Sequence, residues 1–131
     1  MPVYSKLNMV KQFVDSDAGI LEILNSTHEE FGFTGLGANN EDALNEISQW
    51  LELQNQKMLT TSMGDVQRRY QAIPYGWKEI DIAALIARLI VLQKIQINYG
   101  GAVVGKEERR LVDFLRKKTE IDRAIVVRRI A

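Results

Sequence analysis

The stretch from Lys78 to Leu92 constrains the fold more than any other part of this chain. It is long enough for about four helical turns, and most of its residues are aliphatic or alanine. Only a narrow polar stripe, formed by Lys78, Asp81 and Arg88, interrupts the apolar surface. Because a helix that is apolar almost all round is buried, we expect this one to lie inside the fold.

Before this helix, the spacing of apolar residues predicts further helices and a loop. The expected elements are a short helix or an extended arm over about 5–14, a helix over 17–30, a glycine-rich loop over 32–39, a helix over 40–58, an extended segment over 59–61 and a helix over 63–72. Ser16, Asn40 and Ser62 stand where a side-chain oxygen would cap the three longer helices. Pro74 must end the last of them, because proline breaks a helix.

After this helix, the pattern changes to that of a small sheet. Residues 94–99 alternate polar and apolar, which is typical of a strand with one buried face. Gly100 and Gly101 favour a hairpin turn into a return strand over 102–104. A helix over about 106–118 and a final strand over 125–127 complete the chain.

This order of elements is that of a winged helix-turn-helix. We therefore expect a mainly α (α+β) fold, in which a winged helix-turn-helix-like domain carries an N-terminal helical segment and a small antiparallel β-sheet. Residues 1–39 would form the N-terminal helical segment and the glycine-rich loop. Residues 40–131 would form the winged-helix-like domain, with an added C-terminal helix and strand. At 131 residues and 46% hydrophobic content, the chain can build one ordinary core.

The composition excludes several classes of chemistry and location. The chain has no cysteine, so disulfides, thiolate catalysis and cysteine-ligated metals are ruled out. The N-terminus lacks the apolar core of a signal peptide, and the apolar run from Ile82 to Leu92 is too short to cross a bilayer. We expect a cytoplasmic protein without a membrane partner.

The net charge is zero, but the two signs are unevenly distributed. There are 5 Lys/Arg against 10 Asp/Glu up to Gly76, and 12 against 7 from Trp77 onward. The split is consistent with attraction between the two parts, with docking to a larger protein, or with a basic surface for nucleic acid.

Several segments resemble the large P-loop ATPases of BREX phage-defence systems, the BrxC/PglY type. The similarity lies in Pro74–Ile86, which opens Pro-Tyr-Gly-Trp, in Lys94–Tyr99, in Val3–Leu7 and in Ile125–Arg129. Since such ATPases are far longer than 131 residues, the resemblance implies an excised region or a short stand-alone relative. It also implies that ATP and magnesium belong to the parent protein and not to this chain.

The sequence itself supports that division. A phosphate-binding loop needs a glycine-rich backbone followed by Gly-Lys-Ser/Thr. Gly35–Gly37 lacks the lysine and hydroxyl, and Gly105–Glu107 lacks the glycine-rich approach and the hydroxyl. We therefore expect no catalytic residue, cofactor site or metal site here. His28, the sole histidine, has no neighbour spaced to act with it on one helical face.

The candidate contact residues are aromatic or basic. They are Tyr75 and Trp77 beside the Pro74 turn, Lys78 and Arg88 on the central helix, and Arg109, Arg110, Arg116, Lys117 and Lys118 near the C-terminal helix. Burial in the core is the favoured alternative for Trp77. For the basic residues the alternative is a solvated face, in which Asp113 pairs with Arg109, Arg116 or Lys117, and Glu107 pairs with Arg110.

Two functions fit these features. The first is a non-catalytic interaction module of a larger bacterial defence ATPase, which docks other domains or subunits of a defence complex. The alternative is a module that binds double-stranded DNA through its wing and basic C-terminal region. The aliphatic central helix is a poor reader of bases, which favours the first. A stand-alone enzyme ranks last.

Overall fold

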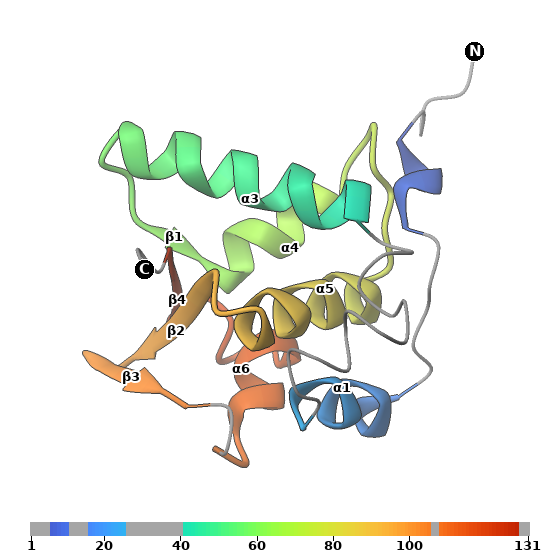
Figure 1. The fold of residues 1–131 in the computed structure, drawn as a ribbon. Coiled ribbons are helices and arrows are strands. Elements are labelled where there is room, and N and C mark those ends of the chain that lie inside the picture. The colour runs from blue at the N-terminus through green and yellow to red at the C-terminus, as the bar shows by residue number, and fades with distance from the viewer. Residues whose placement is uncertain (1–5, 11–15, 26–40, 106–107, 129–131) are drawn as a thin grey trace.

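The computed structural model describes residues 6–10, 16–25, 41–105 and 108–128 (Figure 1). Its elements are the 3-10 turn η1 (Leu7–Met9), α1 (Asp17–Leu24), α3 (Glu41–Gln56), β1 (Thr61–Ser62), α4 (Met63–Gln71), α5 (Glu79–Val91), β2 (Ile95–Tyr99), β3 (Ala102–Val104), α6 (Leu111–Arg116) and β4 (Ala124–Arg128). This order confirms the expected mainly α (α+β) architecture with a small antiparallel sheet. The glycine-rich loop over 32–39, the Asn40 cap and the domain boundary after residue 39 lie outside the described residues.

The helix expected over 17–30 is shorter than predicted. It ends at Leu24, with Asn25 as its C-cap, and residues 26–30 lie outside the described part. Asn25 begins a run of short polar residues in the sequence. Residues of this type have a low preference for helix and favour caps and turns. Ser16 does occupy the N-cap position of α1, but its side chain makes no capping hydrogen bond.

The segment expected as a helix or arm over 5–14 forms only the single turn η1 within the described residues. Tertiary contacts join the start of this turn to the Pro74 turn. The backbone N–H of Lys6 donates to the carbonyl of Pro74, and its carbonyl accepts from the indole of Trp77 as well as from the N–H of Met9 within η1. Lys6 is therefore bonded both to its own turn and to a turn that is distant in sequence.

The helix expected over 106–118 is also shorter than predicted. It is the two-turn helix α6, which starts at Leu111 and ends before Lys117, whose backbone is extended. Its four buried residues are Leu111, Val112, Phe114 and Leu115, so the apolar pattern covers only this length. Residues 106–107 lie outside the described part.

The expected cap at Ser62 is confirmed and fixes the start of α4. The Ser62 hydroxyl accepts from the N–H of Asp65 at 3.1 Å, and the Asp65 carboxylate accepts from the N–H of Ser62 at 3.0 Å. This reciprocal capping box satisfies two backbone donors that the first helical turn leaves free.

The four strands form one antiparallel sheet in the order β1-β4-β2-β3. The wing is the β2–β3 hairpin, which turns at Gly100 and Gly101 with φ of 62° and 83°. Such positive φ values at both turn positions explain the need for glycine. The C-terminal strand β4 lies between β1 and the wing, so the end of the chain completes the sheet.

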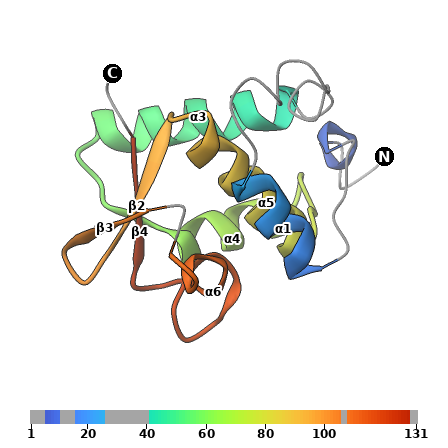
Figure 2. The ribbon, with the colours of Figure 1, turned by 60° about the horizontal axis from the view of Figure 1, so that its bottom comes forward.

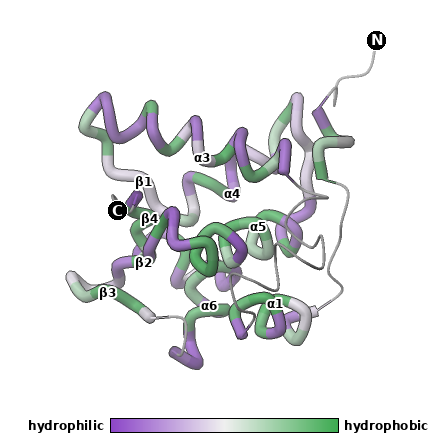
Figure 3. Tube along the Cα trace, in the orientation of Figure 1, coloured by the Kyte–Doolittle hydropathy of each residue, from purple (hydrophilic) through white to green (hydrophobic). Residues whose placement is uncertain are grey.

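The helix α5 occupies the centre of the fold, as its sequence predicts. Ile82, Leu85, Ile86 and Leu89 are at most 1% exposed. Helix α1 packs along α5, and α3, α4, α6 and β2 contact it as well (Figures 1 and 2). Figure 3 shows α5 mostly in hydrophobic colours, whereas α3 alternates because it buries only one face.

The turn that follows helix α3 contains a residue with a strained backbone. Met58 has φ of 59°, and the N–H of Leu59 donates back to the carbonyl of Gln54 at 2.9 Å. This is the Schellman arrangement, in which glycine is the usual residue at the left-handed position. The Met58 side chain is 91% exposed, so it has little packing that could offset the strain.

We predict that Met58→Gly raises the free energy of unfolding by about 0.5–1 kcal/mol, because glycine adopts this conformation without a Cβ clash. Met58→Ala is the matched control, since alanine keeps the Cβ and should leave stability nearly unchanged. Chemical denaturation of the three proteins measures the difference. A glycine variant that is no more stable than the alanine variant would contradict the assignment.

Candidate functional site

Helix α5 stands in the recognition-helix position of a winged helix-turn-helix, between α4 and the wing. A recognition helix must expose polar side chains to base edges. In α5, however, Asp81 and Arg88 are each 3% exposed, and α1 and α6 pack against the helix (Figure 2). The polar stripe expected from the sequence is therefore mostly internal, with Lys78 alone exposed at the N-cap.

Arg88, a candidate contact residue, is buried, and part of its hydrogen-bonding capacity is unused. Its Nε and Nη1 atoms are buried without a hydrogen-bond partner. Burial lowers the pKa of the Arg88 guanidinium, and the charge of Asp81 opposes that effect only in part. The side chain is not presented at the surface, so the structure does not support a direct contact between Arg88 and DNA.

Tyr75 and Trp77 are also buried, at 5% and 3% exposure. The burial that we favoured for Trp77 is thus confirmed. Its ring stacks on Tyr70 of α4, with the centroids 4.8 Å apart, and its indole N–H donates to the Lys6 carbonyl at 3.0 Å. Tyr75 is not presented at the surface as a contact residue either, because its ring packs edge-on against both of these aromatic rings.

Glu46 organises this aromatic cluster, which the sequence did not reveal. Its carboxylate accepts hydrogen bonds from the hydroxyls of Tyr70 and Tyr75, both at 3.0 Å, and lies 3.9 Å from the Lys6 ammonium. The Arg69 guanidinium lies 4.9 Å from the ring centroid of Trp50. Glu46 therefore joins α3 to α4 and to the turn after it.

Arg116, expected as a possible phosphate contact, is a structural ion-pair residue. Its guanidinium donates two hydrogen bonds of 2.8 Å to Glu79 of α5 and a third to Asp17 of α1. The bonds to Glu79, followed by the bond to Asp17, raise the pKa of Arg116 despite partial burial. Arg116 thus joins three helices, and the pairing with Asp113 expected from helical spacing is wrong.

The other basic candidates remain at the surface. Arg110 pairs with Glu108 at 3.7 Å, and the expected partner Glu107 lies outside the described residues. Among the basic candidates, those exposed without an ion pair to any described residue are Lys78, Arg109, Lys117 and Lys118.

The wing offers no cation to a phosphate backbone. Residues 95–104 contain no charged side chain. Tyr99 stacks on Phe114 with the ring centroids 4.1 Å apart, and its hydroxyl bonds to Glu120. The wing is therefore held against α6 and the turn that follows it, and Val103, which is 61% exposed, is its prominent surface residue.

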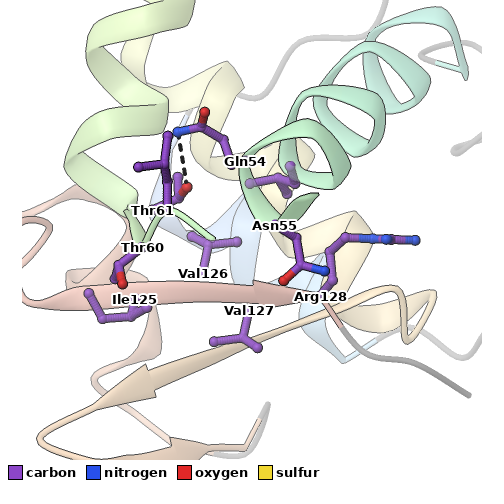
Figure 4. Close-up of a pocket in the computed structure, with 10 residues that line it drawn as sticks. Gln54, Asn55, Thr60, Thr61, Ile125, Val126, Val127 and Arg128 are labelled. Carbon is purple, nitrogen blue, oxygen red and sulfur yellow. Dashed lines mark hydrogen bonds between the residues drawn. The ribbon is translucent and has the colours of Figure 1, made fainter. Parts of the chain in front are cut away.

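A hollow of about 160 Å³ opens between the end of α3, β1 and β4 (Figure 4). Its lining residues are Leu51, Gln54, Asn55, Leu59, Thr60, Thr61 and Ile125–Arg128. Leu59, one of these lining residues, is 53% exposed. Nothing in the sequence pattern marked this surface, because it forms only when the C-terminal strand pairs with β1.

The comparison with known families agrees with this geometry. The family model described as the BREX ATP-binding protein BrxC winged helix-turn-helix domain matches residues 6–130. The chain belongs to this family. No solved structure matches it.

The match confirms the BREX resemblance and the winged-helix fold for this BrxC-type domain. In the described part of the domain, no helix is long and apolar enough to cross a membrane. No group of three or more His, Asp or Glu side chains among those residues is placed to hold a metal ion. The glycine-rich loop and His28 lie outside the described part.

We predict that Arg88→Met lowers the free energy of unfolding of the BrxC-type domain by about 3 kcal/mol, because it leaves the buried Asp81 carboxylate without the nearby positive charge of Arg88. Arg123→Met is the control. It removes an exposed guanidinium and should change stability by less than about 0.5 kcal/mol. Thermal and chemical denaturation measure both variants. Equal or higher stability of Arg88→Met than of the parent domain would contradict this dependence of Asp81 on Arg88.

The aromatic cluster of the domain predicts alkaline sensitivity. Burial raises the pKa of the Tyr70 hydroxyl above its ordinary value of 10.0. The unfolded chain therefore releases this proton at a lower pH than the folded domain, so stability is complete below about pH 10 and falls as the pH rises further. We expect Tyr70→Phe to reduce this slope by about 1 kcal/mol per pH unit. Denaturation curves measured across this range decide the point, and equal slopes for the two proteins would refute it.

Proposed function

We propose that this domain is a non-catalytic docking module of a BREX ATP-binding protein of the BrxC type. It would hold other domains or subunits of the defence complex, in the cytoplasm that the lack of cysteine favours. The covering of α5 by α1 and α6 carries the proposal. A helix whose polar residues face inward is suited to maintaining a scaffold and not to reading bases.

The distribution of charge supports the same proposal. Arg116, Arg68 and Arg110 are engaged by carboxylates of this chain, and the wing is uncharged. These three arginines are thus already paired and the wing supplies no cation, whereas neutralisation of phosphates is the main source of affinity for DNA. Hydrolysis of ATP belongs to the parent protein in this proposal, since the chain has no phosphate-binding loop.

A second candidate function, binding of duplex DNA, rests on the exposed cations at the end of α6. Lys117 and Lys118 follow Arg116, whose bonds to Glu79 bring this end close to Lys78 at the N-cap of α5. These lysines are free to contact phosphates. They would give sequence-independent, salt-sensitive binding.

The two functions predict different results in a fluorescence-anisotropy titration of labelled duplex DNA. The docking module should show only weak binding at low salt, which disappears near physiological salt. The variant to test is Lys117→Gln/Lys118→Gln, and Lys57→Gln/Lys94→Gln is a charge-matched control. Arg116 is left intact because its loss would break the pairs to Glu79 and Asp17.

Binding that persists at physiological salt and falls about tenfold only in the Lys117/Lys118 variant would favour the DNA-binding function instead. The docking function also requires a positive result. The purified domain should bind the remaining domains or subunits of its parent complex in calorimetric titration. Absence of any such binding would reject it.

A further inference from the structure

The hollow beside α3 lies where the pairing between β1 and β4 ends. Strand β1 pairs only with Ile125 and Val126, whereas β2 pairs with β4 along its whole length, from Ala124 to Arg128. Among the described residues, no strand pairs with Val127 and Arg128 on the β1 side, where Leu59 and Thr60 line the hollow instead. Successive residues of an antiparallel strand direct their backbone groups to opposite sides, so one of these two directs its N–H and C=O toward the hollow.

Two leucines supply apolar wall to the hollow, and a hydrogen bond holds its polar wall in place. Leu51 is 3% exposed and belongs to the core, while Leu59 borders the opening at 53% exposure. The Gln54 amide donates to the Thr61 hydroxyl at 3.3 Å, which ties α3 to β1 at the back of the hollow (Figure 4). The space of about 160 Å³ suits one aliphatic side chain and is too small for a folded element.

The rim of the hollow carries hydrogen-bond donors and one cation. Arg128 makes no ion pair or side-chain hydrogen bond with any described residue, and Asn55 lines the same hollow (Figure 4). A guanidinium beside an amide is complementary to a carboxylate. At the opening of the hollow, Leu59 adds exposed apolar surface to this rim.

We propose that this hollow docks an extended acidic peptide segment of a partner protein. The segment places an aliphatic side chain between Leu51 and Leu59, bonds its backbone to the open edge of β4 and sets a carboxylate against Arg128. This is strand addition with one side-chain pocket, in which the backbone supplies affinity and the pocket and charge supply specificity. The inference rests on the docking function proposed above and names its surface.

The test is selection of random displayed peptides against the whole 131-residue chain. We expect the selected peptides to combine an aliphatic residue with a nearby Asp or Glu. Titration of a synthetic version of a selected peptide into isotope-labelled protein should shift the amide signals of Thr60, Thr61, Val127 and Arg128. Enrichment of basic peptides, the absence of any enrichment, or shifts confined to another surface would overturn the proposal.

Two variants and a control make the test specific. Thr60→Trp fills the hollow and should weaken binding of the selected peptide about tenfold. Arg128→Glu should reverse the preference from acidic to basic versions of the peptide. Arg123→Glu makes the same charge change outside the hollow and should leave binding unchanged. Amide spectra of each variant establish that it is folded. Equal binding by Thr60→Trp and the parent chain would overturn the proposal.

This result is separable from that of the docking function. If the Thr60→Trp domain still binds the remainder of its parent complex as tightly as the parent domain does, docking stands and the hollow is not its surface. If neither domain binds the complex, the docking function itself fails.

Discussion

Burial of α5 is the constraint on which the rest of the structure depends. Its aliphatic residues cannot remain in water, so other elements must enclose them, and α1 and α6 provide cover beyond the helix-turn-helix itself. Arg116 fixes this cover electrostatically, since it bonds Glu79 of α5 and Asp17 of α1 from the end of α6. The same packing that stabilises the fold buries Asp81 and Arg88 of the recognition-position helix.

Much of the fold was predictable because local patterns decide it. The periodicity of residues 41–56 and 79–91, the Ser62 cap and the Gly100–Gly101 turn each specify their own conformation. The helix ends were less predictable. At Lys6, contacts with the Pro74 turn, which is distant in sequence, join the short turn η1 to the fold, and no local pattern encodes them.

The candidate site was predictable only in part, because tertiary partners determine what a charged or aromatic residue does. Arg116 has helical neighbours of opposite charge, yet it pairs with residues that are distant in sequence. Arg88 is a charged residue, which the sequence pattern would place at the surface, yet it is buried like a core residue. The hollow beside β4 requires the pairing of β1 with the chain's last strand, which no short-range signal encodes.

Amide hydrogen exchange along α5, measured with and without duplex DNA, tests most directly whether this helix is a covered scaffold element. The account predicts that Ile82 to Leu89 exchange among the slowest amides of the domain and that DNA leaves their rates unchanged. Fast exchange of these amides in the free domain, slowed specifically by DNA, would contradict the account and identify α5 as a nucleic-acid-binding helix.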